Sequence, residues 1–176
     1  DAGRIGVIGG SAGGHLAACL GVMDSVFDAP GEDRSVSAMG NAIILYNPVI
    51  DLNSDNLLRI VPENRSLRDE PGLTREEIGR RVSPIHYVRA GQPPTLIMHG
   101  LDDTNVAPAQ SRRFAEAMRK AGNRCELKLL PGTNHAFVIV NYTAPDEQVV
   151  NAIRCADEFL AGLGYLKGKP ELVTPE

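Results

Sequence analysis

The stretch Gly9-Gly10-Ser11-Ala12-Gly13 decides the predicted fold, because of what stands on either side of it. A short β-branched run from Arg4 to Gly9 precedes it and is typical of a buried strand. An Ala- and Leu-rich run from His15 to Met23 follows it and predicts a helix. A Gly-x-Ser-x-Gly pattern between a strand and a helix predicts a strained turn that holds the serine hydroxyl clear of the sheet. Ser11 is therefore a candidate nucleophile.

A glycine-rich turn of this kind has a second interpretation, a phosphate-binding loop. The glycines around Ser11 do not have the Gly-x-Gly-x-x-Gly spacing, and no Gly-Lys-Ser or Gly-Lys-Thr follows them. The start of the following helix supplies positive potential where an oxyanion would form. The backbone N–H of Ala12 is the expected oxyanion donor, so the pattern favours nucleophilic chemistry over phosphate binding.

The rest of the chain alternates strands and helices. The apolar runs 42–46 and 94–100 predict buried strands, and the alternating run 125–130 predicts a strand with one wetter face. Helical periodicity covers 109–121 and 145–163, and the first of these ends at Gly122. This alternation predicts an α/β fold, with helices flanking a mainly parallel sheet in a three-layer sandwich.

Length and composition limit the class of protein. A chain of 176 residues can build one domain with a sizeable core. The formal net charge of −4 gives no indication of a nucleic-acid partner, and no apolar run is long enough to span a bilayer. The three cysteines lack the spacing of a metal site and are expected to be small core residues, although one disulfide stays open.

Residues 51–93 differ from the rest because they are polar and rich in proline. We expect a catalytic domain over 1–166 that contains this stretch as an excursion, either a partial lid or a solvated connector. Thr74 with Glu77 predicts a capping box at a helix start within it. The Pro- and charge-rich residues 167–176 are expected to form a loose tail.

A serine nucleophile needs a base to take its proton and an acid to orient that base. In this fold class the chain order is serine, then Asp or Glu, then histidine. His135 follows the last predicted strand, which is where the base belongs. Position alone leaves two acids open, Asp102 and Asp103, because both follow the strand that ends at Gly100. The other histidines are expected to pack, bond structurally or lie at the surface; they are His15, His86 and His99.

Three segments together resemble a known family. They are Gly-Gly-Ser-Ala-Gly-Gly-His-Leu-Ala at the turn, Pro-Pro-Thr-Leu-Ile-Met-His-Gly-Leu-Asp-Asp-Thr-Asn-Val after residue 92, and Pro-Gly-Thr-Asn-His-Ala-Phe after residue 130. They are similar to acetyl-esterase and feruloyl-esterase-like α/β-hydrolases, which are related to hormone-sensitive lipase and acetyl xylan esterases. The resemblance covers most of the chain. It implies Asp103 as the acid, His135 as the base, Ser11 as the nucleophile and Ala12 as an oxyanion donor. Asn47 looks inserted where similar esterases have Tyr-Pro-Val, and no role is assigned to it.

One departure from the family matters. Members have several strands and a His-Gly-Gly-type loop before the nucleophile, and that loop supplies the second oxyanion donor. We therefore expect the C-terminal part of a longer enzyme, with the N-terminal strands missing, a bare apolar sheet edge at the first strand, and low activity of the isolated piece.

Three functions compete. The first is a serine carboxylic-ester hydrolase for short acyl esters, acetyl or feruloyl, on a small molecule or on a plant polysaccharide. The second is a prolyl-oligopeptidase-like serine peptidase, which shares the same triad. The third is a non-catalytic binding protein on a hydrolase scaffold. The sequence implies no cofactor and no metal, because the histidines and acids lack the spacings of zinc or EF-hand sites.

Overall fold

The computed structural model describes residues 1, 3–24, 26, 28–33, 35, 37–61 and 72–168. Pro62 and Pro71 of the excursion, and residues 169–176 of the expected tail, lie outside the described residues. The elements follow one another as β1 (Gly6–Gly10), α1 (Ala12–Val22), β2 (Ala42–Tyr46), the 3-10 helix η1 (Leu57–Ile60), α2 (Arg75–Arg81), the 3-10 helix η2 (Pro84–Tyr87), β3 (Thr95–Gly100), α3 (Pro108–Lys120), β4 (Cys125–Leu130) and α4 (Asp146–Gly162).

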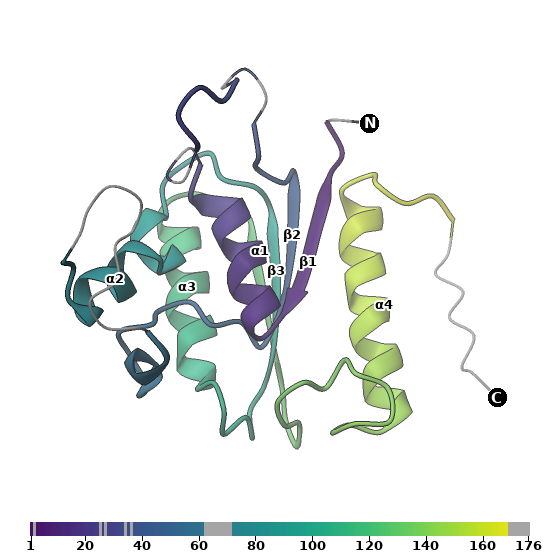
Figure 1. The fold of residues 1–176 in the computed structure, drawn as a ribbon. Helices are drawn as coiled ribbons and strands as arrows, with labels where there is room; N and C mark the ends of the chain where they lie inside the picture. Colours follow the sequence, from purple (N-terminus) through teal and green to yellow (C-terminus); the bar gives the residue numbers. More distant parts are fainter. Residues whose placement is uncertain are drawn as a thin grey trace.

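The four strands form one sheet in the order β1-β2-β3-β4, and every neighbouring pair is parallel. Each strand is followed by a helix that returns the chain to the starting edge, so all four carboxyl ends point the same way (Figure 1). This confirms the predicted α/β class and the parallel sheet. Loops that follow the strands therefore gather at one edge, where such folds bind ligands.

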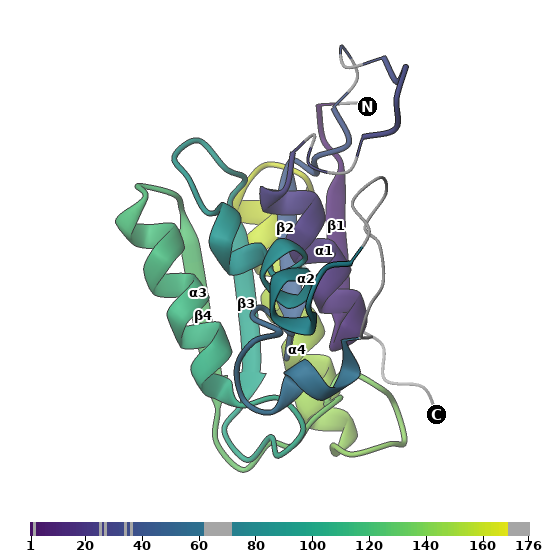
Figure 2. The same ribbon diagram turned by 60° about the vertical axis from the view of Figure 1, so that its left-hand side comes forward.

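Helices cover both faces of the sheet. Helices α1 and α3 pack on one face, and α4 covers the other (Figures 1 and 2). The side chains of β2 alternate between the two cores, with Ile43 and Leu45 facing α1 and α3, and Ile44 facing α4. Because both faces are covered, β2 is an unbroken apolar run of buried residues.

Residues of the excursion form a small cluster of their own. Leu52, Leu57, Leu73 and Ile78 pack together with Val106, which lies in the loop after β3. The capping box predicted at Thr74 is present at the start of α2. The side chain of Gln110, at the start of α3, accepts hydrogen bonds from the backbone N–H groups of Ile50 and Asp51, where the excursion begins. The described part of the excursion is thus attached to the loop after β3.

Strand β1 lies at an end of the described sheet and pairs with β2. Ile5 just before β1 and Ile8 within it are about half exposed, as are Leu16 and Leu20 on α1. The bare apolar edge expected from the sequence is therefore present in the described residues. Among those residues, no helix combines the length and hydropathy that a membrane span requires.

Candidate active site

Ser11 occupies the turn between β1 and α1 in a backbone conformation that residues other than glycine rarely adopt. Its φ is 53° and its ψ is −119°. Its N–H donates to the carbonyl of Tyr46 at 2.9 Å, which fixes the turn to the end of β2. Such strain persists only where the surroundings enforce it, and it points the hydroxyl out of the carboxyl edge of the sheet.

The glycines beside Ser11 explain how the turn closes. A Cβ at Gly9 would overlap the carbonyl oxygen of Gly13, so strand and helix cross backbone against backbone. Gly13 itself has open space where its Cβ would stand, whereas a Cβ on Gly14 would lie 3.0 Å from Pro48 Cβ. The crossing therefore requires a glycine at position 9 and not at position 13. Gly14 makes a close contact with Pro48 instead.

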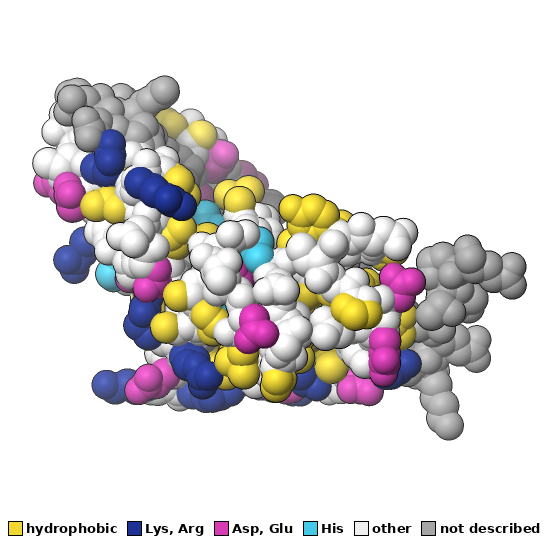
Figure 3. Space-filling view, turned by 90° about the horizontal axis from the view of Figure 1, so that it is seen from below, with side chains coloured by type: hydrophobic (Ala, Val, Ile, Leu, Met, Phe, Trp, Pro, Cys, Tyr) yellow, Lys and Arg dark blue, Asp and Glu magenta, His cyan; other side chains and the backbone are white. Residues whose placement is uncertain are grey.

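The three residues predicted to be catalytic come together at the carboxyl edge. Ser11 Oγ lies 2.9 Å from His135 Nε2, and His135 Nδ1 lies 2.7 Å from Asp103 Oδ2. Asp103 is completely buried through its side chain, while His135 keeps 15% of its side chain exposed. Figure 3 looks onto this edge, where a histidine side chain reaches the surface with hydrophobic side chains close to it.

The carboxylate of Asp103 is held by four donors. Oδ1 accepts the backbone N–H groups of Asn105 and Val106, both at 2.9 Å. Oδ2 lies against His135 Nδ1 and 3.2 Å from His99 Nε2. Burial by itself would raise the pKa of Asp103, but the hydrogen bonds from His99, Val106, His135 and Asn105 outweigh it and hold that pKa at about 2. The acid is therefore an anion at neutral pH.

The loop that carries His135 is fixed at both ends. Thr143 Oγ1 donates to the carbonyl of His135 at 2.6 Å. On the other side, the N–H of Asp102 donates to the carbonyl of Thr133 at 3.0 Å. A Cβ on Gly100 would overlap that same carbonyl, so the loops after β3 and β4 pack backbone on backbone. This contact sets the distance between the acid and the base.

Of the remaining candidates, only His99 contacts this arrangement, through Asp103 Oδ2. Asp102 is exposed and braces the loop through its backbone N–H. His15 Nδ1 lies 3.1 Å from the carbonyl of Val49, and burial lowers its pKa. His86 is exposed. His99 is fully buried and bonds Ser111 Oγ at 2.7 Å, which confirms its structural assignment.

The sequence missed one residue of the site. Asn47 follows β2, is fully buried, and places its Nδ2 3.4 Å from His135 Nε2. A polar residue directly after a buried strand, at the edge shared with Ser11, was the available signal. The apparent insertion of Asn47 into the Tyr-Pro-Val segment of similar esterases conceals this signal.

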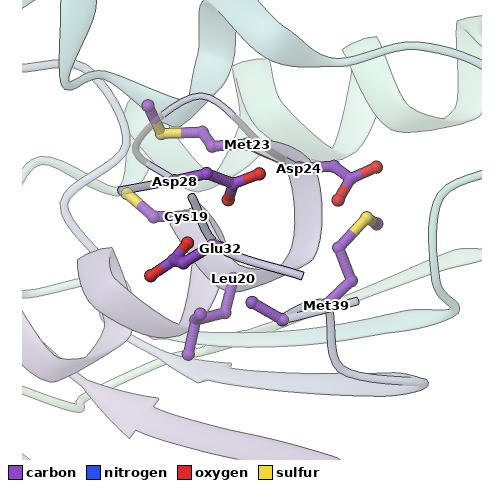
Figure 4. A pocket seen from close by; sticks show the side chains of 8 residues that line it. Cys19, Leu20, Met23, Asp24, Asp28, Glu32 and Met39 are labelled. Atoms are coloured by element: carbon purple, nitrogen blue, oxygen red, sulfur yellow. The ribbon is translucent and has the colours of Figure 1, made fainter. Parts of the chain in front are cut away.

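A separate hollow of about 250 Å³ lies where α1 ends, at the opposite end of the sheet. It is lined by sulfur and carboxylate side chains, including Cys19, Met23, Asp28 and Glu32 (Figure 4). Burial raises the pKa of the Cys19 thiol to about 11, so this sulfur is a poor nucleophile at neutral pH. All three cysteines are free thiols. Among the described residues, no group of three or more His, Cys, Asp or Glu is arranged to hold a metal ion.

A parallel sheet flanked by helices, with a serine on a strained strand-to-helix turn hydrogen-bonded to a histidine and an aspartate from later loops, defines the α/β-hydrolase fold. The sequence model of the BD-FAE family matches residues 1–118, and that of the dienelactone hydrolase family matches residues 79–162. The chain belongs to the BD-FAE family.

Several named relatives are esterases. Esterase LipQ of Mycobacterium tuberculosis is 36% identical over 97% of this chain, and an acetylxylan esterase of Xylanibacter ruminicola is 27% identical over 76%. Solved structures of Thermogutta terrifontis esterase 2, phosphorylated by paraoxon or with butyrate bound, are 40% and 43% identical, each with a TM-score of 0.74, and cover 95% and 96% of the chain.

The chain spans only part of each of these relatives. It corresponds to 42% of LipQ, 26% of the acetylxylan esterase, and 56% and 59% of the two solved chains. The likeness therefore identifies the family and the fold of this chain, and the activity of the whole protein is a separate question.

Proposed function

We propose that this chain carries the catalytic residues of a serine carboxylic-ester hydrolase that cleaves short acyl esters. The observation that carries the proposal is the continuous line of contacts from Ser11 Oγ through His135 to Asp103. A serine joined in this way to an oriented base is an activated nucleophile. A non-catalytic scaffold protein would have no need to keep all three groups in contact.

The reaction proceeds in two halves. His135 Nε2 takes the proton of Ser11 as Oγ bonds to the ester carbonyl carbon, and the same proton passes to the departing alcohol. Asp103, an anion at neutral pH, orients the ring and stabilises its charged form. The N–H of Ala12, the first residue of α1, donates to the oxyanion. Water then enters the site and releases the acid from Ser11.

The named relatives support an ester substrate rather than a peptide. They include an acetylxylan esterase, and one solved esterase has butyrate bound. Acetyl and other short acyl groups on a small alcohol or a carbohydrate are therefore the proposed substrates. A panel of p-nitrophenyl esters of increasing chain length, compared with prolyl p-nitroanilides, separates esterase from peptidase activity.

Replacement of Ser11 by alanine tests the nucleophile. Turnover of p-nitrophenyl acetate should fall by about 10⁴-fold or more, because the covalent route is lost. Paraoxon phosphorylates the related esterase of Thermogutta terrifontis. It should modify the peptide that contains Ser11 here, and the alanine variant should take no label. Ser37→Ala is the matched control, since Ser37 lies in the loop between α1 and β2. Full turnover or labelling of Ser11→Ala would refute the proposal.

A further inference from the structure

Asn47 is held in an unusual conformation at the end of β2. Its φ of 38° lies in the left-handed region, which asparagine tolerates better than most residues. Its N–H donates to the carbonyl of Met98 at 2.8 Å, so the backbone is tied to β3. The whole residue is buried. The fold thus maintains a strained polar residue beside the base.

The side-chain amide of Asn47 has a hydrogen-bond partner at Nδ2 but none at Oδ1 among the described residues. Nδ2 lies 3.4 Å from His135 Nε2, the atom that also faces Ser11 Oγ. Oδ1 is buried without a hydrogen-bond partner among the described residues. A buried unpaired oxygen and a left-handed backbone each cost free energy, and such costs gather at functional sites.

The contacts of Ser11 and Asn47 with His135 Nε2 are available at different stages of the reaction. In the resting protein, the Ser11 hydroxyl donates to Nε2 across 2.9 Å. In the acyl-enzyme, Ser11 Oγ is bonded to the acyl carbon and has no proton to donate. Of the two contacts that the described residues make with Nε2, the one from Asn47 is then the one that persists.

We propose that Asn47 is a positioning residue for deacylation, an inference that rests on the proposed esterase function. Its Nδ2 donates to the lone pair of His135 Nε2 and holds the ring in place while Ser11 is esterified, until the entering water replaces it there. Oδ1 accepts a hydrogen bond from the other O–H of that water. That water gives one proton to Nε2, and its oxygen bonds to the acyl carbon. The bond from that carbon to Ser11 Oγ breaks, Oγ recovers the proton from His135, and the carboxylic acid leaves.

The variant Asn47→Gly tests the amide without disturbing the backbone, because glycine adopts positive φ freely. With p-nitrophenyl acetate, we expect kcat to fall about five- to tenfold, the effect of one lost hydrogen bond. We expect kcat/KM, which reports acylation, to stay within about twofold, and a burst of one equivalent of p-nitrophenol to appear. Asn56→Gly is the matched control, because Asn56 is an exposed asparagine with a φ of 60° in the excursion.

The variant Asn47→Asp tests the side-chain N–H donor separately from the shape of the side chain. It keeps the size and the turn preference of the side chain but replaces the N–H donor with an oxygen, so we expect the same loss of kcat. Normal kcat in either variant would overturn the proposal, as would an equal fall of kcat and kcat/KM in Asn47→Gly. Failure of the esterase function itself would show differently, as absent turnover in the unsubstituted protein or an unchanged rate in Ser11→Ala.

Discussion

Strands β1 and β3 lead to the nucleophile and to the acid, yet their surroundings are opposite. Every residue of β3 is buried between two neighbouring strands and two layers of helices. Strand β1 ends the described sheet, and Ile8 in its middle is 55% exposed. The two strands are parallel members of one sheet, so the difference is one of position and not of type.

The acid Asp103 and the nucleophile Ser11 are therefore held in place by different means. Asp103 is fixed by the interior, through burial and four hydrogen bonds to its carboxylate. Ser11 is fixed by backbone geometry, through its positive φ and the crossing of Gly9 with Gly13. The acid therefore depends on the core, whereas the nucleophile depends on a local turn that tolerates an open side.

The largest expected effect is the loss of stability when a buried side chain on β3 is truncated, compared with an exposed one on β1. Ile97→Ala on β3 removes a fully buried side chain and should lower the free energy of unfolding by about 2–5 kcal/mol. Ile8→Ala on β1 should cost less than about 1 kcal/mol because the side chain is largely exposed. Urea denaturation of both variants measures the difference. Equal losses of unfolding free energy in the two variants would contradict the contrast between β1 and β3 and show that Ile8 is covered in the protein assayed.

The next effect tests the local turn. Gly9→Ala places a Cβ against a backbone oxygen that cannot move aside. It should cost about 1–3 kcal/mol of stability and most of the proposed rate of ester hydrolysis. Gly13→Ala meets open space within α1 and should leave both the rate and the stability nearly unchanged. Initial rates and thermal unfolding distinguish the two. A harmless Gly9→Ala would show that the turn is not held by backbone crossing.

A smaller effect concerns the charge of the acid. The pKa of Asp103 is about 2 in the folded protein, below the ordinary 3.8 of aspartate. A lowered folded pKa stabilises the protein above the unfolded pKa. That stabilisation, on the order of 1–2 kcal/mol, is lost as the pH falls from about 4 to 2. Asp103→Asn should flatten this part of the stability curve in urea titrations. An unchanged slope would contradict the assignment of Asp103 as a strongly held anion.

The smallest effect concerns the end of the base loop. Thr143→Val keeps the shape of the side chain but removes the hydroxyl that donates to the carbonyl of His135. We expect a loss of less than about 1 kcal/mol in stability and a decrease of a few-fold in kcat, because one exposed hydrogen bond is lost. Ser37→Ala again serves as control in the same assays. A loss as large as that from Gly9→Ala would place the weak point of the site in this loop instead.

The sequence predicted the framework well because that framework depends on patterns within short segments. The strands 42–46 and 125–130 were predicted with the bounds they have, since apolar β-branched runs and alternation are local signals. The helix after Ser11 begins at Ala12, three residues before the prediction, because glycines hide the start of a helix from propensity. The 3-10 helices η1 and η2 were not predicted, since they depend on packing within the excursion.

The residues of the candidate site also fall into two groups, those marked by local sequence signals and those revealed only by long-range contacts. The order of serine, acid and base along the chain indicates Ser11 and His135 and leaves the acid open between two neighbouring aspartates. The resemblance to known esterases then favours Asp103. The contacts of Asn47 with His135, and of Gly100 with the loop after β4, join residues far apart in the chain. No periodicity or spacing within one segment encodes such contacts, so the structure was needed to find them.

The bond between the Val106 amide and Asp103 Oδ1 has a practical consequence. An amide proton donated to a carboxylate senses whether that carboxylate is charged, and its chemical shift and exchange rate change when the charge is lost. The Val106 resonance is therefore a built-in spectroscopic reporter of the acid. It allows the ionisation of Asp103 to be followed in solution with no substrate, no inhibitor and no substitution in the active site.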